Sequence, residues 1–360
     1  MQVSVENSRS LSKKRGFLFW LVALTIILAG TVIGAIAVGS TYIEPGEVYK
    51  VLLNKLTNGT LFSGVGEVMT QNIIWEIRFP RVLLGAICGA GLAICGVLMQ
   101  CVTKNPIAEP YILGISSGAS CGAVFVIVLG GVSSVGVNSI TSGAFIGSLL
   151  SGVLVFAIGT QMGKTTSTTR LVLTGMAIST IFSALTNLLI YSAKNSNQAK
   201  NALFWTVGSL GGAKWDVLLI PFIVLVIVMV TAFTMSKSLD ILLLGDDSAI
   251  VLGINVKLIK SIILILATLL TSTLVAITGA IGFIGLVVPH ICRTISGSDH
   301  KKLIVLSALI GSIFLILSDV LARGLFPPVE IPIGIITSLI GGPFFLYLIS
   351  KKNYSFGGSD

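Results

Sequence analysis

Few residues of this chain have side chains suited to chemistry, and the clearest are basic and acidic pairs. Arg78 and Arg81 lie three residues apart, so a helix would place both guanidinium groups on one face. Arginines at a membrane boundary can pair with carboxylates through their planar fork or anchor to lipid headgroups. Asp246 and Asp247 form an acidic pair that suits a helix N-terminus, where the helix dipole favours negative charge.

Motifs for catalysis are absent from the sequence. There is no phosphate-binding GxxxxGK[ST] loop, no HExxH, no CxxC and no GxSxG. His290 and His300 come without further candidate ligands, and the five cysteines lie in or beside apolar stretches. We therefore expect a chain that is not an enzyme, that hydrolyses no ATP itself, and that binds no metal or other cofactor.

The composition indicates a membrane protein. Of the 360 residues, 54% are hydrophobic and only 10% are charged, whereas soluble proteins carry about 25% charged residues. The net charge of +9 fits basic cytoplasmic loops. No basic patch with interleaved aromatic residues suggests a nucleic-acid partner, so none is expected.

The elements that must position these residues are apolar stretches about 20 residues long, the length that crosses a bilayer. We expect an all-α protein with about ten spans, at 17–38, 82–101, 111–130, 140–161, 171–191, 217–235, 258–278, 281–295, 303–321 and 331–349. The distribution of Lys and Arg puts both termini in the cytoplasm of a multi-pass cell-membrane protein. Residues 1–16 and 351–360 are then cytoplasmic tails, and 17–350 form one transmembrane domain. Glycines spaced four apart, such as Gly118 and Gly122, predict close helix packing.

Two segments outside the spans are expected to be helical. Residues 47–56, with Pro45 at the start, predict a short interfacial helix. Residues 236–256 read SKSLDILLLGDDSAIVLGINV and predict two short cytoplasmic helices separated by Gly245, the second ending at Gly253. This segment is either a docking surface for a partner or a solvated connector.

Two other kinds of function compete with a partner-driven transporter. An ion-coupled secondary transporter would need ionisable residues within the spans, and Asp319 is the clearest one present. A membrane enzyme or structural subunit would need a catalytic cluster or a soluble domain, and the sequence shows neither.

Four ordered blocks resemble the FecCD family of importer permeases, which serves iron-siderophores, haem and vitamin B12. They are RFPRVLLGAICGAGLAICGVLMQCVTKNPIAEPYILGISSGA (78–119), LGDDSAIVLGINV (244–256), GAIGFIGLVVPHICR (279–293), and SDVLAR with EIPIGIITSLIGGPFFLYLI (318–349). Ala280 and Ile107 stand where the family often has Pro and Leu. The resemblance implies a type II ABC importer permease that acts as a homodimer or with a close relative, two ATPase subunits that bind ATP and Mg, and an extracytoplasmic substrate-binding protein.

The resemblance also implies roles for particular residues. Arg78, Arg81 and Arg323 would dock the binding protein. The coupling segment that enters the ATPase would comprise Leu244, Gly245, Asp246, Asp247, Ala249, Leu252 and Gly253, with the two aspartates capping the helix and Ala249 and Leu252 in contact with the partner. The cytoplasmic gate would comprise Asn105, Pro106, Ile107, Thr168 and Thr169, although Asn-Pro is also an ordinary turn dipeptide. Transport would proceed by alternating access through a wide, weakly polar cavity.

Overall fold

The computed structural model describes residues 2–39, 42–57, 67–130, 137–161 and 168–351, and within them the elements are helices. The order is α1 (Gln2–Ala37), α2 (Pro45–Leu56), α3 (Val68–Asn72), the π-helix η1 (Ile73–Arg78), α4 (Phe79–Thr103), the 3₁₀ helix η2 (Pro110–Leu113), α5 (Ile115–Leu129), α6 (Val137–Gln161), α7 (Thr168–Tyr191), α8 (Ser196–Val207), α9 (Trp215–Thr234), α10 (Ser236–Leu242), α11 (Asp246–Val251), α12 (Val256–Thr278), α13 (Ile284–Ser296), α14 (His300–Gly324) and α15 (Ile333–Lys351).

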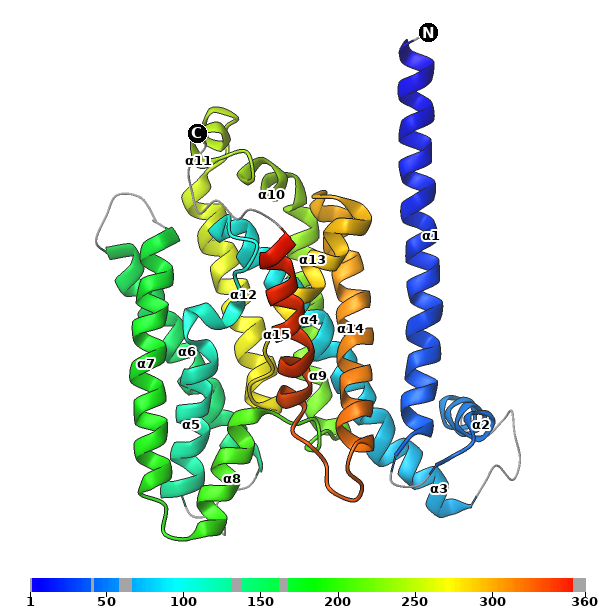
Figure 1. Cartoon of the computed structure of the whole chain (residues 1–360), viewed down its shortest axis with the longest axis vertical. Helices are drawn as coiled ribbons and strands as arrows, with labels where there is room; N and C mark the ends of the chain where they lie inside the picture. The colour runs from blue at the N-terminus through cyan, green and yellow to red at the C-terminus, as the bar shows by residue number, and fades with distance from the viewer. Residues whose placement is uncertain (1, 40–41, 58–66, 131–136, 162–167, 352–360) are drawn as a thin grey trace.

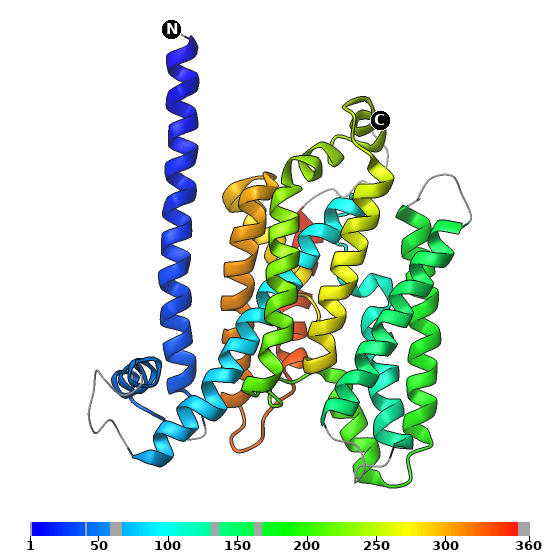
Figure 2. The ribbon, with the colours of Figure 1, turned by 180° about the vertical axis from the view of Figure 1, so that it is seen from behind.

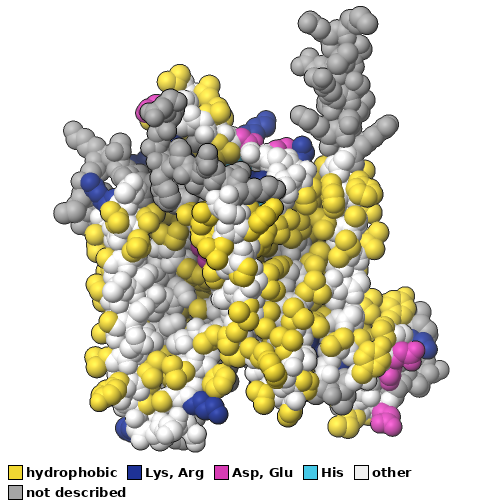
Figure 3. Space-filling model, viewed as in Figure 1, with side chains coloured by type: hydrophobic (Ala, Val, Ile, Leu, Met, Phe, Trp, Pro, Cys, Tyr) yellow, Lys and Arg dark blue, Asp and Glu magenta, His cyan; other side chains and the backbone are white. Residues whose placement is uncertain are grey.

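Eight of the described helices are long and apolar enough to cross a membrane, and α5 and α13 are shorter apolar helices. Together they correspond one to one with the predicted spans, so the expected all-α membrane architecture is confirmed. Apolar side chains cover the sides of the molecule, and charged ones gather mainly towards its two ends (Figure 3). This distribution fits a central apolar region that lies in the bilayer, between two polar ends that meet water.

Helix α4 is the centre of the bundle, and α1 stands at its edge (Figures 1 and 2). In the apolar part of α4, 89% of the residues are buried, against 6% in α1. Helix α1 packs mainly against α14 and, near its C-terminal end, against α2. Most of its surface faces lipid, so these contacts hold it in place.

Small residues let the helices approach one another closely. A Cβ atom on Gly122 of α5 would lie 2.0 Å from the carbonyl oxygen of Gly143 on α6, and one on Gly118 would lie 2.4 Å from that of Gly147. A Cβ on Gly89 of α4 would lie 2.1 Å from the Gly311 oxygen on α14. The predicted role of the glycine pairs as packing surfaces is confirmed.

Two spans start later than the sequence suggests. Regular α-helix begins at Ile115 in α5 and at Ile284 in α13, rather than at 111 and 281. The chain turns at Gly279, whose φ is +68°, a conformation that favours glycine. The hydroxyl of Tyr111 donates to the Ile281 carbonyl at 2.7 Å and accepts from the Ile281 N–H at 3.1 Å. The 3₁₀ helix η2 before α5 and the irregular stretch before α13 are thus bonded to each other.

The extramembrane helices follow the expectations in part. Helix α2 begins at Pro45 as predicted. Helix α8, which the sequence analysis did not predict, begins after Asn195, whose side chain accepts a hydrogen bond from the Gln198 N–H at 2.9 Å. The beginning of α1 and the end of α15 point to the same end of the bundle as α10 and α11 (Figure 1).

Candidate functional site

The three predicted docking arginines meet at the end of the bundle where α1 finishes. Arg78 donates from Nη1 to the carbonyls of Ile36 and Ala37 at 2.6 and 3.1 Å. Arg323 donates from Nη1 to Val38 at 2.8 Å and from Nη2 to Ala35 at 3.1 Å. The last carbonyls of a helix have no partner within the helix, so these two arginines satisfy the C-terminus of α1 and complement its negative dipole end.

Asp319 joins two of these arginines. Its carboxylate oxygens lie 3.0 Å from Nη2 of Arg81 and 3.0 Å from Nε of Arg323, and its side chain is only 2% exposed. Arg81 continues outward to Glu330, at 2.9 Å, whose side chain is 49% exposed. The intramembrane acid found in the sequence is therefore paired with arginine at the end of its helix, which is a structural arrangement for a buried charge.

The structure differs from the predicted arrangement of the three arginines, in which Arg78 and Arg81 share one exposed helix face. The three residues do come together, but Arg78 and Arg81 contact different partners instead of presenting a common face. Arg78 and Arg323 are 5% and 9% exposed, so their guanidinium groups are directed mainly inward. Sequence reasoning missed their contacts with α1, because main-chain carbonyls carry no sequence signal. A docking role for this cluster stays a prediction.

The predicted coupling segment forms a knob at the opposite end, above the apolar bundle (Figure 1). As expected, it consists of two short helices, α10 and α11, separated by Gly245 with φ +113° and followed by Gly253 with φ +81°. Asp246 fastens the knob to the bundle. Its carboxylate lies 2.9 Å from Nζ of Lys104, just after α4, and 2.6 Å from Nζ of Lys260 on α12.

The charge state of Asp246 follows from these contacts. Partial burial raises the pKa of the carboxyl, but the hydrogen bonds and charges of Lys260 and Lys104 outweigh it and hold the pKa below its usual value. The ion pairs are therefore present at neutral pH and are lost only as the pH falls through that lowered pKa.

Two details of the predicted coupling segment are wrong. Asp246 and Asp247 occupy the first turn of α11, but the N-cap is Gly245 and neither side chain caps the helix. Ala249 is fully buried within the chain, whereas Leu252 is 58% exposed. Ala249 therefore packs the knob against its own bundle. The exposed apolar side chains of the knob are instead Leu243, Leu244, Ile250, Val251 and Leu252.

The predicted gate residues lie in the turn after α4 and at the start of α7. The Asn105 side chain accepts a hydrogen bond from the Ile107 N–H at 3.1 Å, which is ordinary turn stabilisation. Pro106 is exposed, and so is Thr169 at the beginning of α7. Thr168 begins α7, and its side chain lies outside the described residues. A gate at these positions stays a prediction.

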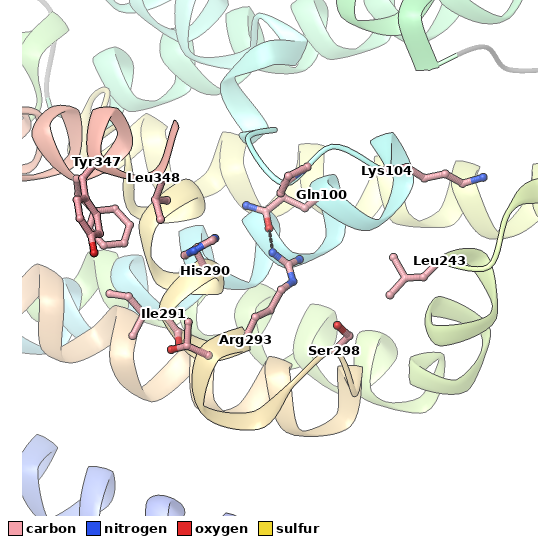
Figure 4. A pocket seen from close by; sticks show the side chains of 12 residues that line it. Gln100, Lys104, Leu243, His290, Ile291, Arg293, Ser298, Tyr347 and Leu348 are labelled. Atoms are coloured by element: carbon pink, nitrogen blue, oxygen red, sulfur yellow. Dashed lines mark hydrogen bonds between the residues drawn. The ribbon is translucent and has the colours of Figure 1, made fainter. Parts of the chain in front are cut away.

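A cavity of about 820 Å³ opens at the end of the bundle that carries the knob, bordered by the ends of α4, α13 and α15. Its polar lining includes Gln100, Lys104, His290 and Arg293, and Phe344 and Tyr347 belong to its apolar wall. Arg293 donates from Nη1 to Oε1 of Gln100 (Figure 4). This pair was not predicted from the sequence, although a Gln inside the most apolar block was a usable signal.

Comparisons with known proteins identify the class to which this architecture belongs. The model of the FecCD transport family matches residues 24–351. The chain belongs to this family of membrane permeases.

Individual relatives agree with that assignment. The chain is 40% identical to the cobalamin import system permease of Halobacterium salinarum over 80% of this chain and 76% of that protein. It is 37% identical to the hemin transport permease of Yersinia pestis, over 94% of this chain and 96% of that one. It is 38% identical to the Fe(3+) dicitrate transport permease of Escherichia coli, over 78% and 85% respectively.

A solved structure shares the fold. It shows an inward-facing conformation of a metal-chelate type ABC transporter, with a TM-score of 0.79 and 29% sequence identity, over 92% of this chain and 99% of that chain. The expected permease architecture is therefore confirmed.

Proposed function

We propose that the chain is the transmembrane permease of an ATP-driven importer that moves an iron chelate, such as a siderophore or haem, or cobalamin. Two separate ATPase subunits bind ATP and Mg and supply the energy, an extracytoplasmic binding protein delivers the cargo, and a second permease completes the pathway. The chain itself acts as neither enzyme nor cofactor carrier, and both of its termini face the cytoplasm of a cell-membrane protein.

The observation that carries this proposal is the exposed apolar surface of the knob. Leu244, Ile250, Val251 and Leu252 are 58–87% exposed, on α11 and in the turns beside it, beyond the membrane-spanning helices. A cluster of large apolar side chains in water costs free energy unless a partner covers it. An ATPase subunit that closes on ATP binding is the partner this surface fits, and the Asp246 ion pairs transmit its movement to α4 and α12.

The opposite end carries Glu330 at its surface, paired with the largely buried Arg81 beside Arg78 and Arg323. We place the binding protein there, because the cytoplasmic partners occupy the other end. Cargo then moves between these two ends by alternating access.

Substitution of Leu252 by Glu tests the proposal. It puts a charge on the exposed knob surface without entering the core, so the chain should still insert while ATP-dependent uptake in proteoliposomes with the ATPase and binding protein falls about tenfold or more. Ser192→Glu, at an exposed position just beyond the far end of α7, is the matched control. Normal uptake by the Leu252 variant, or uptake by the permease alone with an ion gradient and no ATP, would support a secondary transporter instead.

A further inference from the structure

The cavity beside the knob has a cationic group whose donors are mostly unused. Arg293 has five N–H donors, and its side-chain hydrogen bond among the described residues goes to the neutral amide oxygen of Gln100. No ion pair joins Arg293 to a carboxylate in the described part of the chain. An arginine at the wall of a cavity without an acid beside it is a site for an external anion.

The surroundings add positive charge. Lys104 lines the same cavity, and the carboxylate that pairs with it, Asp246, is shared with Lys260. Arg293, Lys104 and Lys260 have two carboxylates near them, Asp246 and Asp240, so one positive charge remains in surplus. The described residues that line the cavity include no Asp or Glu. A partly enclosed cavity with one sign of charge concentrates ions of the opposite sign.

The size and walls of the cavity suggest what kind of anion it takes. A volume of about 820 Å³ is near the upper end for small-molecule sites. Phe344 and Tyr347 line one side, and Arg293 and Gln100 come together in the centre of the view in Figure 4. This combination fits a bulky ligand that presents an apolar or aromatic body to α15 and an oxyanion to Arg293.

We propose that this cavity is an anion-binding site through which the cargo leaves on the cytoplasmic side, with Arg293 pairing with a carboxylate or similar oxyanion of the chelate. The inference rests on the proposed import function and narrows it to cargo with at least one anionic oxygen group. Gln100 is the positioning residue, because its amide oxygen orients the guanidinium group and cannot neutralise it.

The test uses a cysteine at Ser298, an exposed residue on the cavity wall. The full chain with Ser298→Cys is placed in nanodiscs of phosphatidylcholine, and the rates of modification by an anionic and a cationic methanethiosulfonate are compared. The chain without Ser298→Cys gives the background from native cysteines. We expect the anionic reagent to react faster than the cationic one, and added salt to reduce the difference.

Arg293→Gln should lower the anionic-to-cationic rate ratio at position 298 at least about fivefold, from the loss of one unit charge at several ångströms in a partly polar medium. The ratio at Ser192→Cys, just beyond the far end of α7, should not change. Arg293→Lys keeps the charge and should keep the ratio. An equal reactivity of both reagents at Ser298→Cys, before any change at Arg293, overturns the site even if the Gln variant fails to fold.

Ligand protection separates the sources of the anion. Ferric citrate should slow modification of Ser298→Cys, and the concentration needed should rise about tenfold in Arg293→Lys because the bidentate fork is lost. Equal protection by inorganic phosphate, or by phosphatidylglycerol in the nanodisc, keeps the oxyanion site but overturns its assignment to cargo. ATP-dependent uptake by the assembled transporter is measured separately. If uptake is absent while the rate ratio still responds to Arg293→Gln, the import function fails and the anion site stands.

Discussion

Replacing Asp246 by Asn should detach the knob from the bundle without unfolding the permease. The carboxylate joins Lys104 and Lys260 at 2.9 and 2.6 Å, and Lys260 is only 4% exposed. Removing one partner of a fully buried pair costs about 3–5 kcal/mol. The Asp246 side chain is 40% exposed, so solvent screening reduces this cost to about 1–2 kcal/mol.

A cost of that size shifts the equilibrium between a docked and a detached knob by about tenfold, since 1.4 kcal/mol corresponds to a factor of ten. The assay is the distance distribution between spin labels at Ile250→Cys and Leu258→Cys, both exposed. Uptake is measured in parallel in proteoliposomes with the ATPase. We expect a broadened distribution and a several-fold loss of uptake per ATP hydrolysed.

Asp247→Asn is the matched control, because it removes the same charge from the same helix turn at an exposed residue that makes no ion pair in the described chain. The sign of the pH dependence follows from the lowered pKa of Asp246. Its contribution is complete above the ordinary carboxyl range and declines as the pH falls through the folded value. An Asn variant with the wild-type distance distribution and wild-type coupling would refute the reasoning.

Three further predictions concern packing, the arginine cluster and the turn after α4. Gly122→Ala should destabilise the α5–α6 pair by about 1–3 kcal/mol through overpacking, because its Cβ would lie 2.0 Å from a carbonyl oxygen. The measurement is the melting temperature in detergent. Gly30→Ala, with no atom within 4 Å of its Cβ, should leave that temperature unchanged. Arg323→Gln should weaken the attachment of α1 and lower the melting temperature, since a buried charged hydrogen bond is worth about 1.5–3 kcal/mol. If affinity for the binding protein falls while the melting temperature stays the same, Arg323 has a docking role instead. Asn105→Cys should form a disulfide across the permease dimer in at least one nucleotide state, and its absence in every state would count against a gate.

Much of the fold follows from the sequence because each span must satisfy its own backbone in lipid. The apolar lengths therefore predict the helices, and glycines four residues apart predict where they touch. The late starts of α5 and α13 did not follow from apolarity, since residues 111–114 and 281–283 are as apolar as the helices after them. Residues 110–113 form the 3₁₀ helix η2 instead, and the stretch before α13 bonds to the hydroxyl of Tyr111, which comes from a distant part of the chain.

The candidate sites were predictable to a smaller extent. The two short helices of the knob could be located because Gly245 and the acidic pair interrupt an apolar chain. The buried side of this segment could not be predicted from the sequence, because Ala249 and Leu252 are both apolar. Only the packing against the bundle distinguishes them. The capping of α1 by Arg78 and Arg323 was equally hidden, since it joins residues 41 or more positions apart through main-chain oxygens.

The hydroxyl of Tyr111 has a consequence for how the permease can rearrange. One oxygen bonds both the carbonyl and the N–H of Ile281, so the segments that lead into α5 and α13 cannot separate without losing both bonds at once. In the proposed alternating-access cycle, we therefore expect the segments that lead into α5 and α13 to move together.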